Sequence, residues 1–290
     1  MTDVKEIIEK ARAMPVMSYS AMRLMEVLGD ENHSLADVSK IVETDSALTV
    51  EVLRLVNSAA FNLRYQIDTV AKALPYTGEK VIASIALKTC APRFFNRPLS
   101  GYESRKGEMW AHSLRTAIAG GELAARAKET ISSGRAFTAG IVHDIGKPVL
   151  SMFMGGKAAD MLHKIDEGTA KDFFEAEKVT FGTDHCDVGG ELARHWKLPE
   201  HLQAVIQHHH KPGDAPDVHR CLVYLIHLAD MISMMGGSGT GADTMAYQLD
   251  ERYRDYIDLD RNGLDSLMIA VAVEFEKMQS DVFGESEAEE

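Results

Sequence analysis

The sequence predicts an all-α protein in which an N-terminal helical bundle packs on a second helical domain. Apolar residues recur at spacings of three and four along almost the whole chain, whereas the strict alternation typical of strands is short and rare. With 290 residues, 45% of them hydrophobic and 26% charged, the chain can fill one large core or two smaller ones.

The first helices are delimited by capping residues and helix breakers. We predict a helix near residues 3–13, ended by Pro15, and another over about residues 18–28. Ser34 can cap the next helix, SLADVSKIVE, together with Asp37 three residues further on.

Similar signals delimit the next two helices. Asp45 can cap the helix SALTVEVLRLVNSA. Pro75 and Gly78 mark a break in ALPYTGEK. After this break, KVIASIALKTCAPRFF is expected to run as a helix until Pro92 and Pro98 interrupt it.

A domain boundary is expected near residues 95–105, where the polar segment PLSGYESRKGE leads into a second helical block. We predict an N-terminal subdomain over 1–100, a second subdomain over 101–282 and an acidic flexible tail over 283–290. Within the second block, MMGGSGTGAD has the composition of a flexible loop, and GLDSLMIAVAVEFEKM is expected to form an amphipathic closing helix.

Charge and cysteine content limit the partners and the compartment. A net charge of -13 disfavours nucleic acid or an anionic membrane as the main partner, but it allows a local basic pocket for a phosphorylated small molecule. Cys90, Cys186 and Cys221 are too few and too scattered for a disulfide framework, which favours the cytoplasm. We expect no signal peptide and no apolar run long enough to cross a bilayer. The oligomeric state stays open.

The segment FTAGIVHDIGKPVL places His143, Asp144 and Lys147 in an apolar stretch that is expected to be helical. Charged groups are costly there unless they are paired or bind a metal, so His143 and Asp144 are interpreted as metal ligands. Adjacent helical residues diverge by roughly 100°. Both can therefore reach one ion only from a helix end, or when two ions share the aspartate. Lys147 could meet a phosphate oxygen, and the alternative is a structural ion pair with Asp144.

Further candidate ligands occur on either side of this segment. Glu108 and His112 stand four residues apart and project from one helical face. Asp230 is a carboxylate in the apolar helix LVYLIHLADMI, for which a bound cation is the simplest explanation. The remaining candidates are the imidazoles of His185, His209 and His210. For His185 the alternative is a capping or core histidine, and for His209 and His210 it is a histidine stabilised by the dipole at a helix C-terminus.

The ligand types indicate a particular class of metal site. Imidazoles and carboxylates without a thiolate cluster suit Fe, Mn, Zn or Ni better than a structural Cys-rich zinc site. The number of candidates fits two neighbouring ions. Such a pair can clamp the attacking and leaving oxygens of a phosphoester, so hydrolysis of a phosphorylated small molecule is the hypothesis.

These residues resemble the HD superfamily of helical metal-dependent phosphohydrolases, named for the paired His and Asp present here as His143 and Asp144. The resemblance extends to the HDOD family, the HD-related output domain of bacterial signalling proteins. The similar segments are ETDSALTVEVLRLVNSAAFN, MWAHSLRTA, FTAGIVHDIGK, HCDVGGELARHWKLPEHLQAVIQHHHKP and LIHLADMI. They cover roughly residues 10–235 and imply an HD-like metal-site domain in the second block.

The resemblance also implies roles for individual residues. The positions that match metal ligands of the related HD-GYP phosphodiesterases are Glu108, His112, His143, Asp144, His185, His209, His210 and Asp230. Lys147 matches a phosphate-facing lysine, and the implied catalytic residues are Asp144 and Lys147. His208 falls outside the match and is expected at the surface.

The chain departs from these families at two places. After the histidine pair it reads KPGDAPD and lacks the GYP segment associated with cyclic di-GMP hydrolysis, so that substrate is not implied. Thr77 stands before Gly78 where HDOD members usually have leucine, which affects only the expected local packing. No receiver, kinase or cyclase segment is recognised on either side, so input is expected through binding or complex formation.

Three functions are consistent with the sequence. The first is a metal-dependent phosphoric ester hydrolase that acts on a small phosphorylated ligand or a nucleotide. The second is a regulatory module that binds metal or nucleotide and presents a surface to a signalling protein partner without turnover. HDOD members are generally regarded as such modules, and many have lost part of the HD ligand set that this chain keeps. The third is a structural relic that stabilises the second block. Metal binding is favoured over catalysis.

Overall fold

The computed structural model confirms the all-α prediction. Its elements are helices, and the β contacts among the described residues are two isolated bridges, Leu99 with Ser104 and Ala127 with Ile257. The structure describes residues 4–15, 17–30, 32–58, 61–90 and 97–283. The predicted acidic tail lies outside the described residues except for Phe283, with which the last helix ends.

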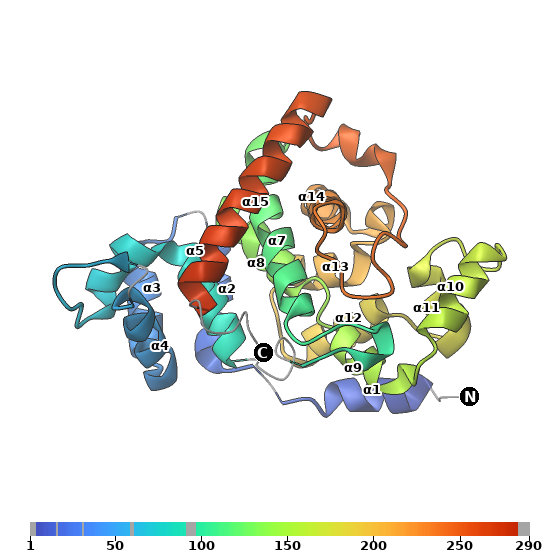
Figure 1. The fold of residues 1–290 in the computed structure, drawn as a ribbon, viewed down its shortest axis with the longest axis horizontal. Helices are drawn as coiled ribbons and strands as arrows, with labels where there is room; N and C mark the ends of the chain where they lie inside the picture. Colours follow the sequence, from blue (N-terminus) through green and yellow to red (C-terminus); the bar gives the residue numbers. More distant parts are fainter. Residues whose placement is uncertain (1–3, 16, 31, 59–60, 91–96, 284–290) are drawn as a thin grey trace.

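Four helices form the N-terminal bundle (Figure 1). They are α2 (Tyr19–Leu28), α3 (Leu35–Glu43), α4 (Ser46–Val56) and α5 (Val70–Cys90). The predicted caps are confirmed. Ser34 and Asp37 form a reciprocal capping box at the start of α3. Asp45 accepts hydrogen bonds from the first backbone N–H groups of α4.

The break predicted at Pro75 and Gly78 is a kink inside α5. Gly78 has a φ of 72°, in the left-handed region that glycine adopts without a steric penalty. Thr77, which replaces the usual leucine, is buried, and its hydroxyl donates to the carbonyl of Ala73 at 3.4 Å. The helix thus accommodates this polar side chain locally. Pro92, the predicted end of the helix, lies outside the described residues.

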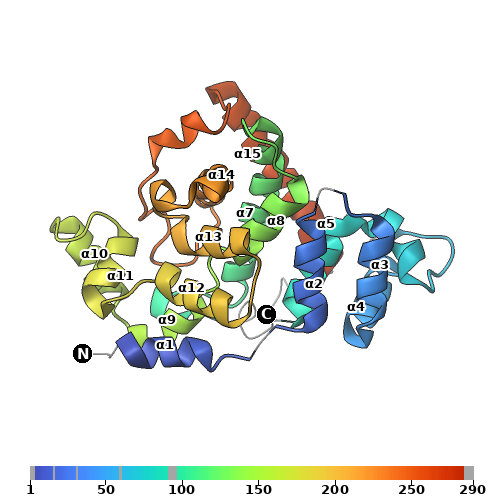
Figure 2. The same ribbon diagram turned by 180° about the vertical axis from the view of Figure 1, so that it is seen from behind.

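The first helix of the chain, α1 (Val4–Arg12), lies beside the second half of the sequence (Figures 1 and 2). It packs against α9 (Lys147–Met154) and α12 (His185–His195). Ile7 and Ala11 form its buried face. Helices from both ends of the sequence therefore share one core, and the domain limits drawn from the sequence stay a prediction.

The second block is arranged around α14 (Asp217–Met235), which is seen end-on in Figure 1. This helix is long and apolar enough to cross a bilayer, contrary to the expectation from the sequence. However, 78% of its most apolar window is buried inside the protein, which is the position of a core helix.

The second block contains further helices. They are α7 (Glu108–Leu123), α8 (Ser133–Val142), α10 (Ala158–Asp166), α11 (Phe173–Phe181), α13 (Glu200–His208) and α15 (Arg261–Phe283). Short 3-10 turns occur at η2 (Ser100–Tyr102), η3 (Ala124–Arg126), η4 (Pro212–Asp214) and η5 (Glu251–Asp255). α7 packs against both α8 and α14, and α13 packs against α12 and α14. α15 crosses α7 and reaches α5, so it joins the N-terminal bundle to the second block (Figure 1).

Two glycines allow helices to meet closely at the centre of the second block. A Cβ on Gly140 would lie 2.6 Å from Cα of Ala117 in α7, and a Cβ on Gly146 would lie 1.9 Å from the carbonyl oxygen of His185. Both distances are far inside van der Waals contact with backbone atoms. The two glycines flank His143 and Asp144, and their contacts hold this segment against α7 on one side and α12 on the other.

Candidate metal centre

His143 and Asp144 lie in the turn that joins α8 to α9, and not inside a helix as the sequence suggested. His143 is the C-cap residue of α8, and Lys147 is the first residue of α9. Because they leave from a helix end, the side chains of His143 and Asp144 can converge. All three side chains are at most 2% exposed.

Asp144 lies between two pairs of imidazoles. Its Oδ2 is 3.6 Å from Nε2 of His112 and 3.4 Å from Nε2 of His143. Its Oδ1 is 3.5 Å from Nε2 of His185 and 3.4 Å from Nε2 of His209. Each oxygen of this one carboxylate therefore faces its own pair of ring nitrogens.

Asp230 of α14 adds a second carboxylate next to the first pair of imidazoles, His112 and His143. Its Oδ1 lies 3.0 Å from Nε2 of His112 and 3.7 Å from Nε2 of His143. Ligand atoms of His112, His143 and Asp144 lie within 4.8 Å of one another, and so do those of His143, His209 and Asp230. Atoms that bind one ion at about 2.0–2.2 Å are on the order of 3 Å apart. The cluster therefore has the dimensions of a metal site.

The rings are oriented through their other nitrogen. Nδ1 of His112 and Nδ1 of His143 each lie 2.7 Å from a backbone carbonyl, which can accept the Nδ1 proton. Nδ1 of His185 lies 2.7 Å from Oε2 of Glu177. Acceptors at Nδ1 keep the proton there and leave Nε2 as the atom available to a metal, which is the usual arrangement of histidine ligands.

Glu177 is a fully buried positioning residue that sequence reasoning missed. It accepts hydrogen bonds from the backbone N–H of His185 at 2.9 Å and from the hydroxyl of Tyr102 at 2.6 Å. We expect Glu177→Gln to weaken metal binding by about 10–100-fold, because the neutral amide supports the His185 ring less well. Chelator competition measures this. Glu175→Gln on the same helix is the control, since Glu175 accepts only the Lys171 N–H among the described contacts. Equal metal affinity of the two variants would contradict the role of Glu177.

Burial and neighbouring charges shift the pKa values of residues in the cluster in different directions. Burial alone would lower the pKa of His143, but the carboxylates of Asp144 and Asp230 outweigh it and raise this pKa to about 10. Burial lowers the pKa of His209 to about 4, although the negative charge of Asp144 opposes the shift. Burial would raise the pKa of Asp144, but the charges of His143 and Lys147 hold it well below its usual range. A proton and a metal ion compete for Nε2 of His143, so metal binding would release that proton.

Lys147 is surrounded by acceptors. Its Nζ lies 2.8 Å from Oδ2 of Asp144, 2.8 Å from Oδ2 of Asp243 and 2.9 Å from Oγ1 of Thr240. An ammonium group has three donors, so each has an acceptor within reach. The ion pair between Lys147 and Asp144, which the sequence left as an alternative, is therefore present, and it lies beside the imidazoles.

Three further residues at the cluster were not predicted from the sequence: Thr240, Asp243 and Cys186. The first two belong to the segment expected to be a flexible loop, yet they are 2% and 0% exposed and contact Lys147. Thr240 is 93 residues from Lys147 in the sequence, so no local spacing could indicate the contact. Cys186 lies with Sγ 3.7 Å from Nδ1 of His209. Its position directly after His185 was the available signal.

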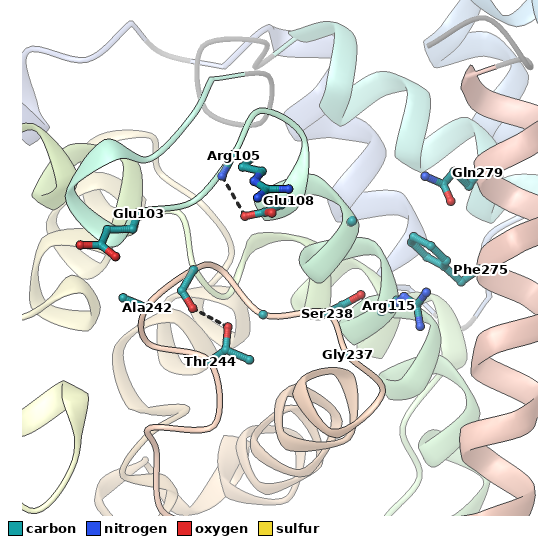
Figure 3. A pocket seen from close by; sticks show the side chains of 13 residues that line it. Glu103, Arg105, Glu108, Arg115, Gly237, Ser238, Ala242, Thr244, Phe275 and Gln279 are labelled. Atoms are coloured by element: carbon teal, nitrogen blue, oxygen red, sulfur yellow. Dashed lines mark hydrogen bonds between the residues drawn. The ribbon is translucent and has the colours of Figure 1, made fainter. Parts of the chain in front are cut away.

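Two predicted ligands lie away from Asp144. The carboxylate of Glu108 accepts a backbone N–H at 2.8 Å and lines a surface pocket (Figure 3). Within the described part of the chain, no contact joins it to the imidazoles. His210 stacks on Tyr247 with ring centroids 4.1 Å apart, and its ring lies 4.9 Å from that of His185. His208, expected at the surface, is partly buried.

Several buried atoms in the cluster have no hydrogen-bond partner, which tests whether these residues suit a metal. Neither oxygen of Asp144 has a donor in hydrogen-bond geometry among the described residues, although Lys147 pairs with it electrostatically. Nε2 of His185 and Nε2 of His210 are also unpartnered within residues 4–283 as far as these are described. Buried polar atoms are normally satisfied, and divalent cations bind acceptors of these types. The residues present therefore fit a divalent metal.

A family model described as the HDOD domain matches residues 14–212. The match begins just after α1 and ends at the first residue of η4, so it includes parts of both helical blocks. It contains every candidate ligand except Asp230, which lies beyond the matched region.

Solved structures share this fold. An HDOD domain protein of unknown function from Geobacter sulfurreducens is 22% identical, with a TM-score of 0.67 over 97% of this chain and 99% of that chain. A protein from Shewanella amazonensis SB2B, named as a proposed phosphohydrolase, is 23% identical, with a TM-score of 0.65 over 95% and 97%. A proposed signal transduction protein from Marinobacter aquaeolei VT8 is 18% identical, with a TM-score of 0.73 over 97% of this chain and 61% of that chain. At these identities the similarity establishes the fold.

A curated relative is an uncharacterized protein from Treponema pallidum (strain Nichols), which is 22% identical over 228 residues. The aligned region is 78% of this chain and 43% of the relative. The chain therefore spans less than half of the length of that relative.

Proposed function

This chain belongs to the HDOD family, and from that premise we propose a signalling protein whose HD-type metal centre hydrolyses the phosphoester of a small phosphorylated molecule or nucleotide. One observation carries the proposal. The two oxygens of Asp144 face separate pairs of imidazole Nε2 atoms inside a buried cluster. A shared carboxylate between two ligand sets supports a pair of ions.

The ligands divide into two sets. The set at Oδ2 of Asp144 comprises His112, His143 and Asp230. The set at Oδ1 comprises His185 and His209, with His210 and Cys186 beside them. Imidazole and carboxylate ligands support Fe, Mn, Zn or Ni as the metal.

The residues around the cluster supply the other requirements of the reaction. A bound divalent ion would supply Lewis acidity toward a phosphoryl oxygen and would lower the pKa of a coordinated water. Lys147 would bind a phosphoryl oxygen through its ammonium group, next to the metal ligands. The buried position of the cluster limits the access of bulk water and strengthens these electrostatic interactions.

Elemental analysis followed by an activity assay tests the proposal. We expect about one to two transition-metal ions per purified chain. We also expect hydrolysis of bis-p-nitrophenyl phosphate or of a cyclic dinucleotide when Mn or Fe is added. The His143→Ala, Asp144→Ala double variant should lose both metal and turnover. Absence of metal from the parent protein would refute a metal-dependent mechanism.

A non-catalytic signalling module is the second candidate, and a specific feature favours it. The N-terminal bundle exposes apolar side chains on α3, α4 and α5, which are suited to a protein partner. Leu35 is 48% exposed, Val50 62% and Tyr76 54%. A protein that holds metal but hydrolyses none of these substrates would support the module over the enzyme.

A further inference from the structure

Residues 236–247 separate the metal centre from an open pocket. On the inner side of this segment, the carbonyl of Ser238 accepts a hydrogen bond from His112, and Thr240 and Asp243 contact Lys147. On the outer side, the same segment lines a pocket of about 660 Å³ (Figure 3). The metal-site side chains are almost completely buried. The pocket and the metal centre are therefore adjacent but separated by this one segment.

The pocket has groups that suit a phosphorylated ligand. Arg105 and Arg115 line it, and the guanidinium of Arg115 lies 3.9 Å over the ring of Phe275 (Figure 3). Arg115 also donates to the carbonyl of Gly236 at 3.3 Å, where the segment begins. Two glutamates share the lining, so the pocket has mixed charge. Arginine binds phosphate through paired hydrogen bonds.

Asp243 provides the negative charge on the segment side of Lys147. Its Oδ2 lies 2.8 Å from Nζ of Lys147 and accepts hydrogen bonds at 2.7 Å from the hydroxyls of Thr240 and Tyr247. A phosphoryl oxygen is also anionic and accepts the same kinds of hydrogen bond. While Asp243 is in place, Asp144, Asp243 and Thr240 surround Nζ of Lys147, and a ligand oxygen has to compete with them.

We infer that Asp243 occupies the position of a phosphoryl oxygen and that a phosphoryl-bearing small molecule, entering through the pocket, displaces it from Lys147. This inference rests on the proposed function, which assigns Lys147 to phosphate binding. Displacement moves residues 236–247 away from Lys147 and joins the pocket to the metal centre. The phosphoryl group of the ligand then lies at Lys147, and the remainder of the ligand lies near Arg105 and Arg115.

Two glycines give the segment backbone freedom for such a movement, which would also break the hydrogen bond from the backbone N–H of Ala242 to the carbonyl of Tyr102. Gly237 and Gly241 have φ values of 84° and 123°, in a region that glycine enters and leaves with little steric hindrance. The inner contacts made by Ser238, Thr240 and Asp243 are hydrogen bonds and an ion pair. A phosphorylated ligand and water can replace polar contacts of this kind.

Calorimetric titration with inorganic phosphate tests the inference. Asp243→Asn keeps the size of the side chain and removes its charge. We expect this variant to bind phosphate about tenfold more tightly than the parent. This is the gain expected if Asp243 blocks Lys147 in about nine of ten parent molecules and the substitution removes the block. The gain should disappear when Lys147→Met is added. The control is Asp258→Asn, which changes the net charge equally at an exposed pair with Lys128.

Equal phosphate affinity of Asp243→Asn and the parent would overturn the inference, and so would an equal gain in Asp258→Asn. Hydrogen exchange of the parent provides a second measurement if the variant does not fold. Phosphate should increase exchange at residues 236–247 relative to chloride at equal ionic strength, without a change in α14. Unchanged exchange would overturn the inference. Metal content and hydrolysis test the proposed function separately. If the protein binds metal and hydrolyses phosphoesters but shows none of these phosphate effects, the inference fails and the proposed function stands.

Discussion

Asparagine at position 144 is expected to abolish stoichiometric metal binding. Asp144→Asn keeps the shape of the side chain but removes the charge that both pairs of imidazoles face. A hydrogen-bond partner outside the ligand set typically changes metal affinity by 10–100-fold, so loss of the shared ligand should weaken binding by more than about 100-fold. Elemental analysis after gel filtration and titration against a chelator measure the loss. Phosphoester hydrolysis should fall with it.

Asp187→Asn provides the matched control for this prediction. Asp187 follows His185 by two residues, but it is 42% exposed and pairs with Lys178 at 3.0 Å. This variant should keep its metal. Thermal unfolding in the presence of chelator shows whether the Asp144→Asn protein is folded without metal. We expect it to be folded, because Lys147 retains Asp243 as an ion-pair partner. Parent-like metal affinity in a folded Asp144→Asn protein would contradict the proposed ligand set.

Gly146→Ala is expected to lower the free energy of unfolding by about 3 kcal/mol, at the upper end for an overpacked site. The added methyl carbon would lie 1.9 Å from the carbonyl oxygen of His185 and 2.6 Å from the backbone nitrogen of Gly189. Backbone atoms cannot rotate away, so α9 and α12 must separate. Because this movement also displaces His185 from Asp144, we expect metal affinity to fall together with stability. Urea unfolding and metal titration measure the two effects.

Gly190→Ala tests whether the effect comes from the close helix contact. Gly190 lies on α12, the helix of His185, and the atoms nearest to its added carbon would be side-chain atoms of Arg194 and Gln207, at 3.5 Å. We expect unchanged stability or a gain of up to about 1 kcal/mol, because alanine is the better helix former. Equal stability of the Gly146→Ala and Gly190→Ala proteins would show that the contact at Gly146 does not hold α9 against α12.

Local signals predicted much of the helical structure. The caps at Ser34 and Asp45 are where the sequence placed them, and α1 and α2 lie close to their predicted ranges. These signals succeed because a cap or a helix breaker acts within a few residues of the chain. Gly78 interrupts α5 where the sequence placed a break. A prediction that failed depends on contacts distant in the sequence: the segment with Thr240 and Asp243, expected to be a flexible loop, is buried against Lys147.

By itself, the sequence determined the helical class, the approximate limits of the N-terminal helices and the chemical types present: imidazoles, carboxylates and one lysine in apolar surroundings. Only the tertiary structure decided that Nε2 atoms from α7, the α8 to α9 turn, α12 and the end of α13 face one carboxylate. It also decided that Glu108 lies at a pocket and that Asp243 pairs with Lys147. The physical reason is the distance along the sequence over which each effect acts. Helix periodicity and capping act over a few residues, whereas these contacts depend on how closely distant helices pack.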